Sequence, residues 1–218
     1  MGKDDRMNAD RSVHHPLFAR WYACTAPGME RTIAGYRREL LAGLSGPVIE
    51  VGAGTGLNFR HYPDAVTEVL AVEPEEYLRA RALTAAREAP VAVTVVNGIA
   101  ERLPADTASF QAAVASLVLC SVHDQDQAVA ELARVLRPGG ELRFFEHVRA
   151  DTPRLARVQT ALDAVWPRVG GGCHVSRDTV KHIERAGFAI EDLRRFRLPD
   201  TRIPFPTSPI VLGRARVV

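Results

Sequence analysis

The chain has 218 residues, enough for one α/β domain with a small insertion, and its 46% hydrophobic and 25% charged residues are ordinary for a globular protein. A formal net charge of +2 argues against a surface built to attract nucleic acid or an anionic membrane, and no apolar run approaches the ~20 residues that span a bilayer. The three cysteines, Cys24, Cys120 and Cys173, show no CxxC spacing, which disfavours disulfides and zinc and indicates a cytoplasmic location.

The pattern of apolar residues predicts a disordered leader at 1–12 and then a single domain over 13–218. N-terminal helices occupy 13–46, divided in two by Pro27-Gly28. Further helices are predicted at 76–88, 126–136 and 179–186, and strands at 47–51, 66–72, 91–96, 110–119, 141–146, 188–196 and 209–217. Apolar strands that alternate with helices predict an α/β fold, a mostly parallel sheet with helices on both faces.

The segment 148–178 is longer than a plain crossover between strand and helix, and we interpret it as a candidate lid. It contains three consecutive glycines, Gly170-Gly171-Gly172, which could act as a hinge. Parallel sheets bind ligands at the carboxyl ends of their strands, so a lid over that edge would close a ligand site.

A glycine loop, Glu50-Val-Gly-Ala-Gly-Thr-Gly56, joins the first predicted strand to an expected helix. Glycines there permit positive φ angles and let a ligand approach the backbone closely. The G-x-G-x-G spacing differs from the G-x-G-x-x-G of dinucleotide enzymes, and no GK[ST] follows as in a phosphate-binding loop. Glu50, the acidic residue before the loop, suits a ligand with a cationic amino-acid group.

Two further segments extend this pattern. The second strand ends in Glu73-Pro74, about twenty residues past the glycine loop, where a carboxylate can accept both hydroxyls of a ribose. Asn97-Gly98 follows the third strand, where an adenine ring would lie, and Arg137-Pro-Gly-Gly140 precedes the fifth.

In order and spacing, these segments resemble the class I S-adenosylmethionine (SAM)-dependent methyltransferases over about residues 47–146. The resemblance implies a Rossmann-like fold with seven strands, and SAM as cofactor with S-adenosylhomocysteine as its product. It implies that the glycine loop lies under the cofactor, that Glu73 holds the ribose, that the segment after strand three borders the adenine and that the end of strand four lies beside the sulfonium. The expected cofactor-binding residues are Glu50, Gly52, Ala53, Gly54, Gly56, Asn58, Glu73, Pro74, Gly98, Ile99, Ala100, Glu101, Ser116 and Leu117.

Outside this core the chain resembles a narrower family, the methyltransferase-like thiol S-methyltransferases. The similarity is carried by Ser116-Leu-Val-Leu-Cys-Ser-Val122, Glu146-His-Val148, the stretch from Trp166 to Gly171-Gly-Cys-His174, and Ser208-Pro-Ile-Val-Leu-Gly213. Vertebrate members of that family are membrane-associated enzymes that methylate hydrogen sulfide and small alkyl thiols. The resemblance implies a small thiol as acceptor, and because their apolar N-terminal anchor is absent here, we expect no membrane insertion.

Methyl transfer from a sulfonium mainly requires alignment of the acceptor, which supplies ~7–11 kcal/mol of a barrier. A thiol, with a pKa near ~8.5, needs a modest base at most. Candidate catalytic residues are His147 and His174, with Glu146 placed to orient His147 or touch the cofactor. The expected substrate pocket comprises Trp21, Tyr22, Cys120, His123 and Trp166. We interpret Cys120 as a packing residue, since no covalent intermediate is needed, and predict no metal.

Several alternatives remain open from the sequence. The same fold could methylate oxygen or nitrogen of a secondary metabolite or quinone, or bind SAM without catalysis. An NAD-dependent oxidoreductase is disfavoured by the glycine spacing and the Arg-Pro-Gly-Gly turn. An RNA methyltransferase is disfavoured because no N/D-P-P-[FY] motif follows the fourth strand. The acceptor is thus expected to be a small molecule, and both a monomer and a homodimer are compatible with the sequence.

Overall fold

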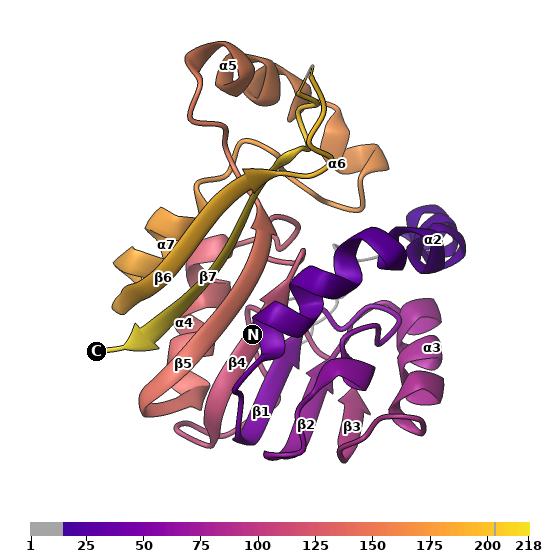
Figure 1. The fold of residues 1–218 in the computed structure, drawn as a ribbon, viewed down its shortest axis with the longest axis vertical. Helices are drawn as coiled ribbons and strands as arrows, with labels where there is room; N and C mark the ends of the chain where they lie inside the picture. The colour runs from indigo at the N-terminus through magenta and orange to yellow at the C-terminus, as the bar shows by residue number, and fades with distance from the viewer. Residues whose placement is uncertain (1–14, 203) are drawn as a thin grey trace, which may run out of the picture.

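The fold is built on a seven-stranded sheet with the strand order β3-β2-β1-β4-β5-β7-β6 (Figure 1). The computed structural model describes residues 15–202 and 204–218, so the predicted leader at 1–12 lies outside the described residues. All neighbouring strands are parallel except β7, which runs antiparallel to β5 and β6. The predicted α/β class and mostly parallel seven-stranded sheet are confirmed. The strands are β1 (Gly46–Val51), β2 (Val66–Val72), β3 (Val93–Val96), β4 (Phe110–Ser116), β5 (Leu136–His147), β6 (Phe188–Arg197) and β7 (Pro209–Val217).

Helices cover both faces of the sheet, which explains why the central strands are apolar at nearly every position. On one face, Val48 of β1 and Val114 of β4 pack with α2 (Pro16–Leu41) and α3 (Glu76–Ala86). On the other face, Ile49 and Ala113 pack with α4 (Gln125–Val135) and α7 (Thr179–Arg185). Alternate residues of one strand therefore enter two separate hydrophobic layers.

The N-terminal segment forms one helix, α2, where two were expected. Figure 1 shows that this helix is bent along its length. A proline inside a helix removes one backbone hydrogen bond, which bends a helix without necessarily ending it. Ile33, Leu40 and Leu41 are buried against the sheet, and this burial holds the second half of α2 in place.

Apart from α2, three elements differ from the prediction by more than two residues or in kind. β4 ends at Ser116, three residues early, because Leu117 has a φ of 59° and leaves the strand. The Arg-Pro-Gly-Gly turn lies inside β5 as an irregular start of that strand, where its pairing with β4 shifts register. The glycine loop leads into a short 3-10 helix, η1 (Phe59–His61), and no α-helix follows, because the residue before Pro63 disfavours the helical conformation.

The candidate lid at 148–178 contains α5 (Pro153–Leu162) and α6 (Trp166–Val169), which lie in a lobe beyond the carboxyl end of β5 (Figure 1). Gln159 of α5 is fully buried and fixes the helix to the neighbouring segments. Its amide nitrogen donates to the carbonyls of Val148 and Pro206, and its amide oxygen accepts from the backbone N–H of Ala150. Only the second half of the segment, from α6 onward, lines the cavity described below.

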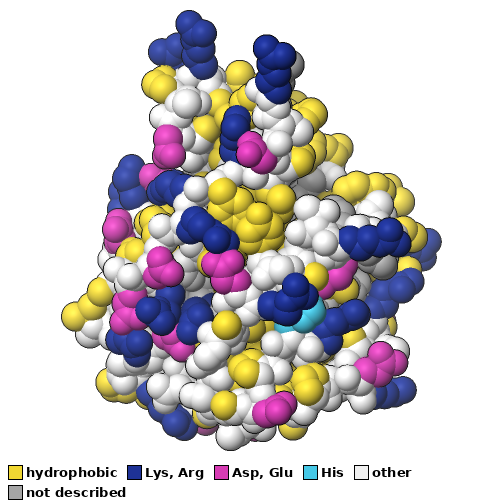
Figure 2. Space-filling view, in the orientation of Figure 1, with side chains coloured by type: hydrophobic (Ala, Val, Ile, Leu, Met, Phe, Trp, Pro, Cys, Tyr) yellow, Lys and Arg dark blue, Asp and Glu magenta, His cyan; other side chains and the backbone are white. Residues whose placement is uncertain are grey.

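The surface carries both signs of charge. Figure 2 shows Lys and Arg side chains interspersed with Asp and Glu over the visible face, with a cluster of hydrophobic side chains in a hollow below the lobe. Such mixing does not form the basic stripe of a nucleic-acid-binding face. Within 15–202 and 204–218, no helix combines the length and hydrophobicity that crossing a bilayer demands.

Candidate active site

A cavity of about 1080 Å³ opens where β1 and β4 lie side by side. The chain runs from β1 outward to β2 and β3, and β4 then starts the other half of the sheet, so the loops after β1 and β4 diverge. Open α/β sheets bind ligands in the crevice at this switch point. Pockets for one small ligand usually measure ~300–1,000 Å³, so this cavity has room for a cofactor and an acceptor together.

The glycine loop forms one wall of the cavity. Gly52 and Gly54 line it and have φ angles of 62° and 58°, which non-glycine residues rarely adopt. A Cβ atom on Gly52 would lie 2.2 Å from Cγ2 of Val118 in the turn after β4. Glycine is therefore required at position 52 so that the loops after β1 and β4 can meet.

Glu73 directly follows β2, and its side chain is buried at the cavity wall. Its Oε2 accepts from the backbone N–H of Gly54 at 2.7 Å, and its Oε1 accepts from that of Glu75 at 2.9 Å. Burial raises the pKa of Glu73, and these two hydrogen bonds counteract the rise. Each carboxylate oxygen can accept a further bond, so Glu73 can receive two hydroxyl groups from a ligand.

An apolar slot continues from Glu73. It is lined by Val72, Leu78 and the segment after β3, Gly98-Ile99-Ala100-Glu101, with Pro74 at its edge. A Cβ atom on Gly98 would lie 3.0 Å from Cγ1 of Val72 and 3.1 Å from Cδ of Pro104, so the segment packs closely there. Together the glycine wall, the carboxylate and the apolar slot fit the amino-acid, ribose and adenine parts of SAM.

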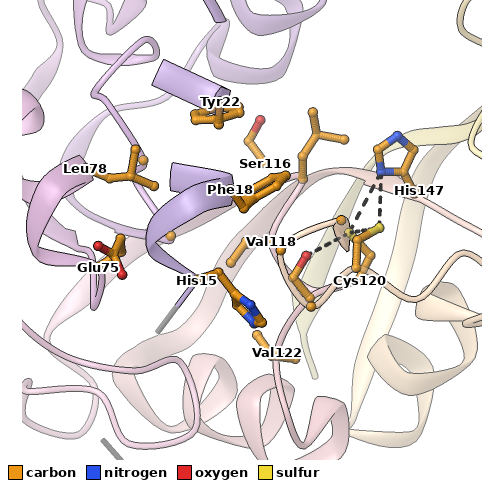
Figure 3. Close-up of a pocket in the computed structure, with 18 of the residues that line it drawn as sticks. His15, Phe18, Tyr22, Glu75, Leu78, Ser116, Val118, Cys120, Val122 and His147 are labelled. Atoms are coloured by element: carbon orange, nitrogen blue, oxygen red, sulfur yellow. Dashed lines mark hydrogen bonds between the residues drawn. The ribbon is translucent and has the colours of Figure 1, made fainter. Parts of the chain in front are cut away.

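The turn after β4 separates the two ends of the cavity (Figure 3). Leu117 lines the cavity in a left-handed conformation that costs of order 1–3 kcal/mol for a non-glycine residue and often marks functional sites. Its backbone N–H donates to the carbonyl of Phe145 at 2.7 Å. Glu146 is fully buried and accepts from the backbone N–H groups of Val118, Leu119 and Cys120.

This geometry changes the role expected for Glu146. Its carboxylate is occupied by three backbone donors and does not line the cavity, so it touches neither a cofactor nor an acceptor. It positions the turn that carries Ser116 and Cys120 to the cavity wall.

The acceptor end brings together Cys120, His147 and Cys173, which come from distant parts of the chain. Figure 3 labels Cys120 and His147 in this group. The two Sγ atoms lie 3.5 Å apart, and His147 Nδ1 lies 3.9 Å from Cys120 Sγ and 3.8 Å from Cys173 Sγ. The hydrogen bond from Cys173 and burial raise the pKa of Cys120 well above its usual range. The free Cys120 thiol is therefore a poor nucleophile.

The remaining candidates for the acceptor pocket also line this cavity: Trp21, Tyr22, His123, Trp166 and His174. His174 is partly exposed, with Nδ1 3.8 Å from Asp163 Oδ2, and burial together with the charge of Arg177 lowers its pKa. The structure thus gathers around one cavity three of the predicted histidines and both tryptophans, although they lie far apart in the sequence.

Four residues expected to touch the cofactor lie behind the wall: Glu50, Ala53, Gly56 and Asn58. The Glu50 carboxylate accepts from Asn58 Nδ2 at 2.8 Å and from the Tyr62 hydroxyl at 2.7 Å, so it is satisfied within the protein. Asn58 in turn accepts from Arg37 Nη1 at 2.7 Å. Glu50 and Asn58 therefore brace the glycine loop from behind.

Arg37 is a buried residue that the sequence reasoning missed. It pairs with Glu30 at 3.1 Å and reaches both Asn58 and Ser116, linking α2 to the loops after β1 and β4. One signal could have revealed it: Arg37 lies in the helical apolar stripe formed with Ile33, Leu40 and Leu41. A charged residue on a buried stripe requires a partner.

Burial raises the pKa of Glu50 to about 7, although Tyr62, Asn58 and Arg37 counteract the shift. The native state therefore binds a proton that the unfolded chain releases near pH ~4.5, and stability falls as pH rises from there to about 7. At 1.36 kcal/mol per pKa unit, this group lowers the free energy of unfolding by about 2–3 kcal/mol between pH 5 and 8.

We expect Glu50→Gln to remove this fall in the free energy of unfolding between pH 5 and 8, because glutamine has nearly the same shape, can still form hydrogen bonds and does not titrate. Urea unfolding at a series of pH values measures it, with Glu68→Gln, an exposed glutamate on β2, as the control. Parallel curves for wild type and Glu50→Gln would show that Glu50 is already ionised in the native state at pH 5.

The fold and the site define a class of enzyme, the class I SAM-dependent methyltransferases, and comparison with known proteins agrees. A methyltransferase domain family matches residues 49–144. Thiol S-methyltransferase TMT1B of Homo sapiens is 31% identical over 205 residues, which cover 88% of this chain and 83% of the relative. The ubiquinone/menaquinone biosynthesis C-methyltransferase UbiE of Caulobacter vibrioides is 35% identical over 111 residues, covering 50% of this chain and 41% of UbiE.

A solved SAM-dependent methyltransferase from Thermotoga maritima superposes with a TM-score of 0.64 at 19% identity, covering 90% of this chain and 98% of the other. The chain belongs to the SAM-dependent methyltransferase family that includes the thiol S-methyltransferases. It is a methyltransferase with SAM as its cofactor.

Proposed function

We propose that the acceptor is a small thiol, methylated on sulfur, and that the cofactor-facing residues bind SAM as follows. Glu73 accepts the ribose hydroxyls, Gly52 and Gly54 face the amino-acid part, and the slot from Gly98 to Glu101 holds the adenine. When bound, the cofactor supplies a methyl group on a positively charged sulfur. Ser116 and Leu117 also line the cavity and are the residues we expect beside that sulfur.

The observation that carries the thiol proposal is the composition of the acceptor end. Its described lining includes aromatic and aliphatic side chains, among them Phe145, Trp166 and Ile210, together with cysteines, histidines and the hydroxyl groups of Ser121 and Thr207. The carboxylates in the described lining are Glu73, Glu75 and Glu101, which follow β2 and β3. A hydroxyl acceptor needs a strong general base, whereas a thiol with a pKa of about 8.5 ionises without one.

Carbon methylation of a quinone-like ring is the second candidate, favoured by the similarity to UbiE over half of the chain. The apolar acceptor end could also hold a flat ring. The relative named as a thiol S-methyltransferase matches 88% of the chain against 50% for UbiE, and this difference supports the thiol proposal over carbon methylation.

We expect turnover of small alkyl and aryl thiols, and none of the alcohols or phenols of the same shape. Release of S-adenosylhomocysteine and mass spectrometry of the product would measure it, with matched thiol and hydroxyl pairs and a hydroquinone in the panel. A methyl group found on a ring carbon of the hydroquinone, with thiols unreacted, would contradict the proposal and favour the second candidate.

A further inference from the structure

We propose that Cys120, His147 and Cys173 form a three-ligand zinc site at the acceptor end, with the fourth coordination position open to the cavity. The zinc would hold the acceptor as a thiolate, and this role rests on the proposed function. Catalytic zinc sites use three protein ligands, a Cys₂His set among them, and keep the fourth position for water or substrate.

The distances suit zinc. The three potential ligand atoms form a triangle with sides of 3.5, 3.8 and 3.9 Å. In the plane of this triangle, the point equidistant from the three atoms lies about 2.2 Å from each. This value falls between the usual Zn–S distance of ~2.3 Å and the Zn–N distance of ~2.0–2.1 Å. Among the histidine, cysteine, aspartate and glutamate side chains of the described residues, these three have ligand atoms close enough together to hold a metal ion.

Separate elements hold each ligand in place. Cys120 lies in the turn after β4, where its backbone N–H donates to Glu146 and its carbonyl accepts from His174 N at 2.8 Å. His147 is the last residue of β5. Cys173 follows Gly172, whose φ is 85° and whose added Cβ would lie 2.9 Å from the carbonyl oxygen of Ser121. A glycine at 172 is thus required for Cys173 to reach Cys120.

The charges also suit a divalent cation bound by thiolates. Two cysteine thiolates and a neutral imidazole balance the charge of Zn²⁺. Arg177 donates from Nη1 to the carbonyls of Leu119, Cys120 and Val122, which places a positive charge beside the cluster. That charge favours both the anionic ligands and an anionic acceptor.

All three ligands line the cavity, so an acceptor can reach the fourth position. The acceptor thiol binds zinc through sulfur and loses its proton to water. A sulfur lone pair forms the new S–CH₃ bond as the bond from that methyl to the sulfonium breaks, and the electron pair of the broken bond stays on the former sulfonium sulfur. The product is a neutral thioether, a weaker ligand than a thiolate, so it leaves the metal.

Metal content of the full-length protein tests the site directly. We expect about one zinc per chain after purification under reducing conditions without chelators. The cobalt-substituted protein should show thiolate-to-cobalt charge transfer and the intense visible bands of a tetrahedral site. Cys173→Ser and His147→Asn should lose the metal and keep their affinity for S-adenosylhomocysteine, which shows that they are folded. Cys24→Ser, in an exposed position on α2, is the matched control and should keep the metal.

Two results would overturn the zinc site: no metal after reconstitution with micromolar zinc, or a cobalt spectrum unchanged by Cys173→Ser. A metal-free protein with a Cys120–Cys173 disulfide that methylates thiols at the full rate would overturn the role of zinc in holding the acceptor. A cobalt spectrum unmoved by a small thiol would overturn the open fourth position. Failure of the thiol proposal is distinguishable, because it would leave a metal-loaded protein that methylates no thiol.

Discussion

Glu73→Gln should weaken the binding of S-adenosylhomocysteine about 100-fold, the largest loss we expect from any single substitution at the cofactor end. A hydrogen bond to a charged group contributes about 1.5–3 kcal/mol, and the carboxylate can make two to a ribose. The loss of about 3 kcal/mol corresponds to a factor of at least 100 in the dissociation constant. Glutamine also places an amide N–H₂ against the backbone N–H of Gly54 or Glu75, which would disturb the loop.

Isothermal titration calorimetry with S-adenosylhomocysteine measures this loss. Glu76→Gln, an exposed glutamate in the first turn of α3, removes the same charge three residues away and should bind within about twofold of wild type. Equal affinities for the two variants would show that Glu73 supports the glycine loop only and does not contact the ribose.

Arg37→Met should lower the free energy of unfolding by about 3 kcal/mol, because removal of one partner from a buried ion pair costs about 3–5 kcal/mol. Glu30 would keep His61 as a partner at 3.1 Å, and Asn58 would lose the donor to its side-chain oxygen. Because Arg37 also reaches Ser116, the affinity for the cofactor should fall as well.

Denaturant unfolding measures the effect, with Arg38→Met, an exposed neighbour on the same helix, as the control. The double variant Arg37→Met, Glu30→Gln should recover part of the loss, since it no longer leaves a buried carboxylate with a missing partner. An Arg37→Met protein as stable as Arg38→Met would show that water replaces the guanidinium without cost.

The sequence by itself determined the fold class and predicted where the cofactor end of the site lies. The apolar strands predicted a sheet covered on both faces, and the glycine loop with Glu73 about twenty residues later predicted a ribose-binding carboxylate. These features are local, because each depends on the end of one strand and the few residues that follow. A parallel sheet then brings the carboxyl ends of its strands to one edge whatever the details of packing.

The tertiary structure alone decided which polar residues face the cavity and which lie behind it. Glu50 precedes the glycine loop and Glu73 follows it about twenty residues later. Of the two, Glu73 lines the cavity, whereas the Glu50 carboxylate accepts hydrogen bonds from Asn58 and Tyr62 behind the wall. The cluster of Cys120, His147 and Cys173 has no sequence spacing that marks it. Its ligands come from the turn after β4, the end of β5 and the segment after α6, and such contacts form only when those elements pack together.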